Sequence, residues 1–296
     1  ANESGSSVKL YNGTTEIGSA TVSGTSWSYT ATLVDGTTYQ FNSKEKDLAG
    51  NTSTATSRFA VTGDTTPPTI SSVAISGATG IQNNFLNAGD NVSLTATFSE
   101  NVPVSGTPQV PLVIGADNRT ATYTSGNSST QLVFQYTIQA GDTDSNGISI
   151  GANVLALNSG TIWDAAGNNA TLTHSALSDN SSYMVDTTAP TASWSAATDN
   201  VGTVTGALTS GDTTDDTSLV LSGTNESGSS VKVYNGTTEI NNATVTGTNW
   251  SYTASVVDGT TYQFNVKETD LAGNTSTATS NFAVTGDTTA PTANLS

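Results

Sequence analysis

NVSLTATFSE, residues 91–100, alternates apolar and polar side chains along its length. A period of two is typical of a β-strand that buries one face and turns the other to solvent. The same alternation runs through residues 132–139 (LVFQYTIQ) and residues 262–268 (YQFNVKE). No stretch carries a sustained apolar repeat of about 3.6 residues, the period of an amphipathic helix. We therefore predict an all-β protein.

Turn sequences separate these strands at a spacing of about 8–12 residues, which is typical of β-sandwiches. Asn12-Gly13 and Asn235-Gly236 each lie between a strand and its return strand. Asn-Gly favours a type I′ hairpin turn there, because both central residues need a positive φ. Tyr39 and Tyr262 each follow an Asp-Gly-Thr-Thr segment, at the corner where Greek-key sandwiches carry a tyrosine. We predict Greek-key β-sandwiches of the Ig-like or cadherin-like kind.

One stretch of the chain occurs twice: residues 1–69 match residues 224–292 at 57 of 69 positions, at an offset of 223 residues. Self-similarity at a fixed period is the sequence mark of an array of modules. The copies share Trp27 and Trp250, which we predict to lie in their cores. No counterpart of residues 187–223 precedes the first copy. We therefore expect that copy to lack about two strands and to expose part of its core, and the chain to be a segment of a longer tandem protein.

A second motif, Asp-Thr-Thr followed by Pro-Pro or Ala-Pro, marks the module boundaries and begins at Asp64, Asp186 and Asp287. These positions are 122 (186 − 64) and 101 (287 − 186) residues apart, and each length suits one domain. Proline restricts its own φ and the residue before it, so the joints should be stiffer than Gly/Ser linkers. The predicted parts are a truncated module (1–63), a module of a second subtype (64–185), a complete copy of the first module (186–286) and the stub of another (287–296).

The chain carries 24 acidic and 7 basic residues, a net charge of −17, and no cysteine. This charge argues against nucleic acid and anionic membranes as partners, since both need Lys and Arg for neutralisation. No apolar run approaches the roughly 20 residues of a membrane span. Without disulfides, an extracellular protein needs another source of stability. An acidic surface makes a divalent cation the first candidate.

Carboxylates recur at matching places in the modules. Each module has a boundary Asp and a turn of sequence Asp-x-Ala-Gly-Asn, which in an Ig-like sandwich joins the last two strands at the N-terminal pole. Glu100 and Glu226 (with its copy Glu3) end strands at that same pole, and the C-terminal pole of the preceding module carries corner-loop aspartates. Carboxylates meeting at a joint would repel one another unless a cation lay between them.

Ca²⁺ fits such a joint, because it takes six to eight oxygen ligands in flexible geometry, whereas one His and no Cys disfavour softer metals. The alternative is that these Asp and Asn side chains only serve turns, through hydrogen bonds to the backbone. The stretch from Asp199-Asn200 to Asp215-Asp216 is a candidate for a further site. The predicted ligands are Asp35, Asp47, Asp64, Glu100, Asp142, Asp144, Asp164, Asn168, Asp186, Glu226, Asp258, Asp270, Asn274 and Asp287.

Enzymatic chemistry finds little support in the residues, and we predict no enzyme. His174 is the only histidine, and its alternating Thr/Leu surroundings favour an exposed strand position over a base. The duplicated module contains neither His nor Cys, so no Ser-His-Asp or Cys-His set can be built in it. A glycosidase with two carboxylates is not excluded by counting, but the acidic residues lie in duplicated joints and not in one unique cleft.

Ligand binding is the second class of function. Trp194 or Trp163 could stack on a sugar, or the Thr-rich strands could meet a host surface or, as a weaker alternative, ice. A binding module is expected to have unique aromatic-rich loops, whereas the most distinctive loops here are the repeated ones. We therefore predict a spacer in preference to a ligand-binding module.

Residues 198–202 (TDNVG) and 210–236 (SGDTTDDTSLVLSGTNESGSSVKVYNG), with the DTTAP linkers and DLAGN turns, resemble the extender repeats of giant bacterial adhesins of the type I-secreted RTX class. The resemblance covers essentially the whole chain. It implies an elongated rod of tandem sandwiches on the bacterial cell surface, stiffened by Ca²⁺ at the joints. Such a rod holds a distal binding region away from the cell for adhesion or biofilm formation. The partners it implies are neighbouring modules of the same chain, with no insertion into a membrane.

Overall fold

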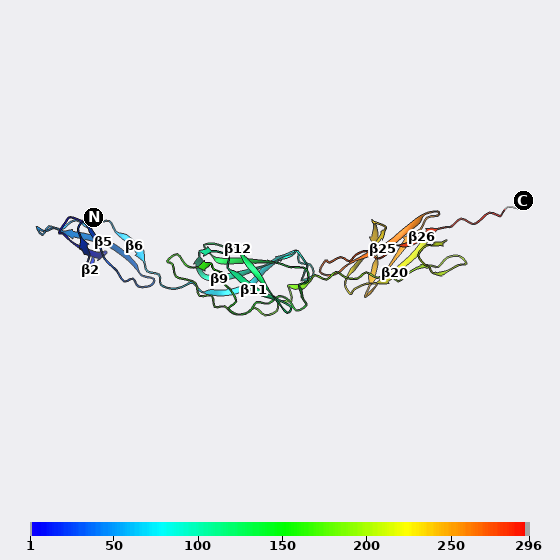
Figure 1. The fold of residues 1–296 in the computed structure, drawn as a ribbon, viewed down its shortest axis with the longest axis horizontal. Helices are drawn as coiled ribbons and strands as arrows, with labels where there is room; N and C mark the ends of the chain where they lie inside the picture. The colour runs from blue at the N-terminus through cyan, green and yellow to red at the C-terminus, as the bar shows by residue number, and fades with distance from the viewer. Residues whose placement is uncertain (1, 294–296) are drawn as a thin grey trace.

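The computed structural model describes residues 2–293, and every regular element within them is a β-strand. Three modules follow one another along the long axis of the molecule, from the blue first module to the yellow and red third one (Figure 1). The all-β prediction is confirmed. This part of the chain contains no helix able to cross a membrane.

The middle module packs two sheets around one core. Its larger sheet has the strand order β11-β12-β13-β9-β7 and its smaller sheet the order β14-β16-β8, and β10 and β15 form a separate two-stranded ribbon. Phe134 and Leu94 of the larger sheet share the buried core with Leu86 and Val185 of the smaller one. The strands are β7 (Ile70–Thr79), β8 (Phe85–Leu86), β9 (Asn91–Val102), β10 (Val104–Ser105), β11 (Gln109–Ile114), β12 (Asp117–Ser125), β13 (Ser129–Thr137), β14 (Thr143–Asp144), β15 (Thr161–Ile162) and β16 (Met184–Asp186).

The third module is a sandwich of two five-stranded sheets, in the orders β18-β17-β20-β24-β23 and β19-β26-β25-β21-β22. Trp250 and Leu221 of the first sheet share the core with Phe264 and Val233 of the second, which confirms Trp250 as a core residue. The strands are β17 (Ala196–Asp199), β18 (Gly206–Ala207), β19 (Asp212–Thr214), β20 (Ser218–Thr224), β21 (Ser230–Asn235), β22 (Thr238–Asn242), β23 (Thr244–Thr246), β24 (Asn249–Ser255), β25 (Thr261–Thr269) and β26 (Phe282–Gly286).

The first module has a four-stranded sheet, β2-β1-β5-β6, and the ribbon β3-β4. Phe282 of the third module stacks on Trp194 with ring centroids 5.2 Å apart, whereas its copy Phe59 is 69 % exposed. Trp27 is only half-buried, because the strands that cover its copy have no counterpart here. The strands are β1 (Ser7–Asn12), β2 (Thr15–Ser19), β3 (Thr21–Ser23), β4 (Ser26–Ser28), β5 (Thr38–Lys46) and β6 (Phe59–Thr62).

The tyrosine corners are present, but the hairpin turns differ from the expected type. The hydroxyl oxygens of Tyr39 and Tyr262 each accept a hydrogen bond from a backbone N–H five residues upstream, at 3.0 and 3.2 Å. Asn12 pairs directly with Thr15, so the two-residue loop is Gly13-Thr14, and of these Gly13 has the positive φ, +64°. This geometry is a type II′ turn. The type I′ prediction is wrong because Asn12 is the last residue of its strand, with its Oδ1 accepting from the Gln40 N–H.

His174 is buried, so its predicted exposure is wrong. Its Nε2 lies 3.0 Å from the backbone N of Val154 and accepts that N–H, while Nδ1 lies 2.9 Å from the Ser175 carbonyl oxygen. The ring therefore carries its proton on Nδ1 and serves as a cap for an irregular loop. The Thr/Leu alternation around it could not reveal these long-range partners.

Candidate cation-binding joints between the sandwiches

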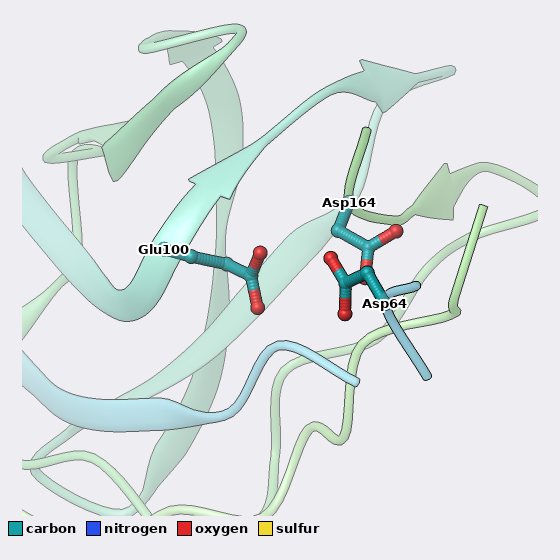
Figure 2. Close-up of side chains that lie close together, drawn as sticks. All are labelled: Asp64, Glu100 and Asp164. Carbon is teal, nitrogen blue, oxygen red and sulfur yellow. The ribbon is translucent and has the colours of Figure 1, made fainter. Parts of the chain in front are cut away.

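Three carboxylates from distant parts of the sequence meet where the middle module begins. One ligand oxygen from each of Asp64, Glu100 and Asp164 lies within 4.8 Å of the others, and the three side chains point toward one another (Figure 2). Asp64 follows β6 of the first module, Glu100 lies on β9, and Asp164 follows β15. The structure thus brings together the boundary Asp, the strand-end Glu and the turn Asp, as the sequence predicted.

The Asp-Ala-Ala-Gly-Asn turn positions Asp164. One carboxylate oxygen accepts the backbone N–H groups of Ala166, Gly167 and Asn168 at 2.7–2.8 Å, and the other accepts Asn168 Nδ2 at 2.7 Å. Asn168 Nδ2 also lies 3.2 Å from the backbone oxygen of Asp64. Burial acts to raise the pKa of Asp164, but these hydrogen bonds outweigh it and hold the pKa below its usual range. Asp164 therefore does serve its turn through hydrogen bonds to the backbone. The same turn also places the Asp164 carboxylate at the joint.

The first module contributes Asp35 from its C-terminal corner. This carboxylate accepts the Thr65 N–H at 2.7 Å and the Thr66 hydroxyl at 2.8 Å, and these hydrogen bonds lower its pKa. Asp258 binds the next linker in the same way, accepting from the Thr288 N–H at 2.6 Å and the Thr289 hydroxyl at 2.7 Å. The linker threonines thus fasten each linker to the module that it leaves.

The pKa of Glu100 reflects the repulsion among the carboxylates at this joint. Burial raises its pKa, and the neighbouring charges of Asp164, Asp64 and Asp35 raise it further. Asp35 therefore acts on the same site from across the joint. A cation placed among these carboxylates would relieve the repulsion, and hard oxygen ligands of this kind suit Ca²⁺.

The joint at Asp186 repeats these turn and linker contacts, although in the part of the chain that the structure describes its carboxylates do not form a group within 4.8 Å like that of Asp64, Glu100 and Asp164. Asn274 Nδ2 donates to the Asp270 carboxylate and to the Asp186 backbone oxygen, both at 2.9 Å. Burial raises the pKa of Glu226, followed by the charges of Asp270, Glu268 and Asp186. An open cavity of about 450 Å³ is lined by Glu226, by Asp186 and by linker residues 188–191.

Glu268 belongs to this joint and was missed from the sequence. It is fully buried, and its Oε1 accepts the Glu226 N–H and, at 2.6 Å, the Ser229 hydroxyl. Its Oε2 has no hydrogen-bond partner among the described residues. Glu268 follows Phe264 and Val266 at alternate positions of β25. This alternation places it on the core-facing side of the strand, so its burial could have been predicted. Burying a carboxylate oxygen without a hydrogen-bond partner costs free energy, which a bound cation would offset.

The N-terminal pole of the first module carries the same set. Glu45, the copy of Glu268, accepts the Glu3 N–H at 2.6 Å, and Asp47 accepts the Asn51 N–H at 2.7 Å and its Nδ2 at 2.8 Å. Hydrogen bonds from the Asn51 side chain and backbone lower the pKa of Asp47. These four residues line one open cavity of about 240 Å³.

Two predicted ligands have protein partners instead. Asp142 is buried and accepts Arg119 Nε at 2.6 Å and the Tyr136 hydroxyl at 2.7 Å. Asp144 is also buried and accepts the Gly115 and Gly147 N–H groups, both at 2.8 Å. At this corner the linker is held by Thr187, whose hydroxyl donates to the Asp142 backbone oxygen at 2.9 Å. Among the described residues neither carboxylate belongs to a group of three such side chains, although Asp144 and Asp186 line one cavity of about 310 Å³.

The Asp199–Asp216 stretch folds onto itself at the C-terminal pole of the third module. Asp199 and Asp216 are both buried. The Thr214 hydroxyl donates to Asp199 at 2.7 Å, and the Ser218 N–H donates to Asp216 at 2.7 Å. Asp287 meets this region through its backbone N–H, which donates to the Thr214 oxygen at 2.8 Å. These protein partners account for the stretch as a turn.

Direct protein contacts add to the Asp186 joint. Asn83 Nδ2 donates to the Leu271 backbone oxygen at 2.9 Å, and Asn87 Nδ2 donates to the Ala272 oxygen at 2.8 Å. Both asparagines come from the β7–β9 region of the middle module, and both acceptors belong to the Asp-Leu-Ala-Gly-Asn turn of the third. One module therefore seats its loop on the turn of the next.

Comparison with known proteins agrees with this architecture. Residues 187–288 match the family model described as a bacterial Ig-like domain. Since the first module repeats the sequence of the third, the chain is an Ig-like repeat protein, and its fold is the Ig-like β-sandwich.

One curated relative is exoglucanase B of Cellulomonas fimi, 28 % identical over 288 residues. The alignment covers 93 % of this chain and 22 % of that protein, so the chain spans about a fifth of the relative's length. Among solved structures, the fibronectin(III)-like modules of Clostridium thermocellum CbhA are 14 % identical, covering 73 % of this chain and 94 % of theirs with a TM-score of 0.32. Bacteroides ovatus SGBP-B, solved with a mixed-linkage heptasaccharide, is 14 % identical, covering 95 % of this chain and 60 % of its own with a TM-score of 0.19.

Proposed function

We propose that this chain is a non-catalytic spacer of a bacterial surface protein, in which Ca²⁺ at the joints stiffens tandem Ig-like sandwiches into a rod. The observation that carries the proposal is the convergence of Asp64, Glu100 and Asp164 within 4.8 Å, and the charge of Asp35 in the preceding module also acts on Glu100. The unpartnered, buried Oε2 of Glu268 supports a second ion at the Asp186 joint. In the surface protein, an adhesin of the type I-secreted class, the rod holds a distal region away from the cell for adhesion or biofilm formation.

Typical affinities of extracellular calcium modules suit a joint that stiffens outside the cell and loosens inside it. Extracellular calcium modules bind with a Kd of about 10⁻⁴ to 10⁻³ M. At a free Ca²⁺ concentration 100 times the Kd, one site adds about 2.7 kcal/mol to the stability of a module, against a typical total of roughly 5–15 kcal/mol. The joints would thus be loose at cytoplasmic Ca²⁺ levels and stiff outside the cell.

Calcium titration calorimetry combined with thermal unfolding tests the site. We expect Glu100→Gln to weaken Ca²⁺ binding at least about 10-fold, since even the loss of a residue that only orients a metal ligand costs about 10- to 100-fold in affinity. In chelator the same substitution should raise the Tm, because it removes one repelling charge. Glu239→Gln, an exposed carboxylate on β22, is the matched control and should leave Ca²⁺ binding unchanged. Absence of Ca²⁺ binding by the unsubstituted chain would sink the proposal.

Ligand binding through the sandwich faces is the competing function. The name of the exoglucanase relative suggests carbohydrate as the ligand to test. Trp194 argues against a sugar platform on this chain, because it packs against Trp250 and Phe282 with ring centroids 5.8 and 5.2 Å away. A glycan array would decide between the two functions: specific binding by the isolated chain would favour the ligand-binding alternative.

A further inference from the structure

His174 is buried in a part of the middle module that carries no other charge. Its side chain is 7 % exposed. Residues 149–158, residues 169–178 and the strand β11 contain no other titratable side chain. The charged residue closest in sequence to these segments is Asp179, whose carboxylate accepts the side-chain amide of Asn146. The elements packed around the ring therefore supply no counter-charge for a protonated imidazole.

The segment that contacts the ring also covers the edge of a sheet. β11 is an edge strand of the larger sheet, and its free side is bridged at two points. Ser149 exchanges backbone hydrogen bonds with Val113 at 2.8 and 3.2 Å, and Ala156 exchanges them with Gln109, both at 2.8 Å. These four bonds satisfy edge groups that would otherwise be open to solvent or to another strand.

Between the two bridges the covering segment forms an arc that is held from its other side. β11 carries Pro111 there, which has no N–H to offer. Residues 150–155 find partners in residues 174–177 instead: Ile150 and Leu177 exchange backbone hydrogen bonds at 2.8 and 2.9 Å. The cover of β11 therefore depends on how firmly this second segment holds the arc.

His174 is the central contact of that second segment. Its Nε2 lies 3.0 Å from the backbone N of Val154 and 3.4 Å from that of Leu155, and it accepts both N–H groups. Asn153 completes the contact, since its Oδ1 accepts the His174 N–H at 2.8 Å and its own N–H donates to the His174 carbonyl oxygen at 3.2 Å. The two N–H groups of the arc thus rely on an unprotonated Nε2.

Acid converts this acceptor into a donor. Imidazole groups in water take up a proton near about pH 6.5. A proton on Nε2 would face the N–H groups of Val154 and Leu155, so that donors would meet donors and a buried charge would have no partner. Both arrangements cost free energy in a buried site. Release of the arc removes that cost, because water then reaches the ring and the N–H groups.

We propose that His174 is an acid-sensitive latch, which holds residues 150–156 along the edge of β11 at neutral pH and releases them when Nε2 takes up a proton. Release frees the N–H and C=O groups of Gln109, which Ala156 covers in the closed state. An uncovered edge is where a sheet can take up a further strand, so the latch keeps the larger sheet closed at neutral pH. It lies within the middle module and uses no cation, and so stands apart from the calcium proposal.

Hydrogen exchange at the amides of Val154 and Ala156 tests the latch in the full chain. A local measure is needed because the crowded joint carboxylates affect overall stability in the same pH range. After correction for intrinsic exchange, protection of both amides should fall at least about 10-fold from about pH 7 to about pH 5, a change of roughly 1.4 kcal/mol. The Phe134 amide, on the central strand of the same sheet, should keep its protection. His174 is the only histidine, so its imidazole NMR signal should titrate with the same midpoint as the loss of protection.

His174→Gln should remove the pH dependence, because a Gln oxygen can accept at the place of Nε2 and takes up no proton. Thr173→Gln, an exposed change in the same segment, is the matched control and should behave like the unsubstituted chain. Protection at Val154 and Ala156 that stays constant with pH in the unsubstituted chain would overturn the latch. So would a fall that persists in His174→Gln, or two midpoints that differ. The result should be the same in Ca²⁺ and in chelator, so the latch would stand even if the chain bound no Ca²⁺.

Discussion

At the residue scale, the joint carboxylates fall into two groups with opposite pKa shifts. Glu100 and Glu226 are crowded by other carboxylates, and burial together with those charges raises their pKa. Asp35 and Asp258 accept hydrogen bonds from the linker threonines, which lowers their pKa. Ionisation of Glu100 and Glu226 is therefore opposed by burial and like charges, whereas ionisation of Asp35 and Asp258 is favoured by their hydrogen bonds.

These shifts predict how stability depends on pH in chelator. A group whose pKa is raised by folding binds a proton more readily when folded, so its contribution is lost as the pH rises through the folded pKa. Groups with a lowered pKa contribute above about pH 4, near the unfolded Asp pKa, and lose that contribution as the pH falls. We expect the free energy of unfolding to be higher near pH 5 than at pH 7 and to fall again below about pH 4.

Urea unfolding across this pH range provides the measurement. With saturating Ca²⁺ the slope between pH 5 and pH 7 should vanish, because the cation replaces the proton at the same oxygens. A flat profile in chelator would contradict the repulsion inferred for Glu100 and Glu226.

At the scale of single elements, the Asp-Leu-Ala-Gly-Asn turn offers a matched pair of sites for substitution. Ala272→Asp places a charge in a buried contact, which costs roughly 1–3 kcal/mol when it is left unpaired. Ala49→Asp makes the same change in the same turn sequence at an exposed position and should change stability by less than about 0.5 kcal/mol.

Thermal unfolding with tryptophan fluorescence would report both variants. Ala272→Asp should also loosen the Asp186 joint, which an increase in local protease sensitivity of the linker would show. Equal effects of the two substitutions would mean that loop 80–87 does not support the joint.

Local patterns predicted most of the elements, and the failures share a cause. Alternation over two residues located β9, β13 and β25. The boundary motif, the strand end and the repeated turn motif placed Asp64, Glu100 and Asp164, respectively, at one pole. Asp142 was misjudged because its partner Arg119 lies 23 residues away on β12. His174 was misjudged because the N–H groups that it caps lie about 20 residues upstream. A pattern among residues adjacent in the sequence does not predict contacts between residues about 20 positions apart.

At the scale of the whole molecule, removal of calcium should change shape more than fold. The sandwich cores lie within single modules, while the clustered carboxylates lie between them. We expect chelator to leave the β-sheet circular dichroism at 25 °C unchanged and to broaden the distribution of distances between modules.

Small-angle X-ray scattering with and without Ca²⁺ would measure this change. The Asp186 joint, which has direct contacts from Asn83 and Asn87, should bend less than the Asp64 joint. Spin labels placed across each joint would separate the two. Identical scattering in both conditions would mean that calcium does not set the stiffness of the chain.

The parallel pairing of β8 with β16 and of β19 with β26 has a mechanical consequence. A pull on the linkers enters each complete module near its first strand and leaves through its last, and these short parallel ladders join the two regions. Tension therefore runs along the ladders and loads their hydrogen bonds in shear, so that they must break together and not one after another. Within the described residues the first module has the isolated parallel bridge between Asp35 and Gly63, so the resistance to shear is expected of the two modules that carry a parallel ladder.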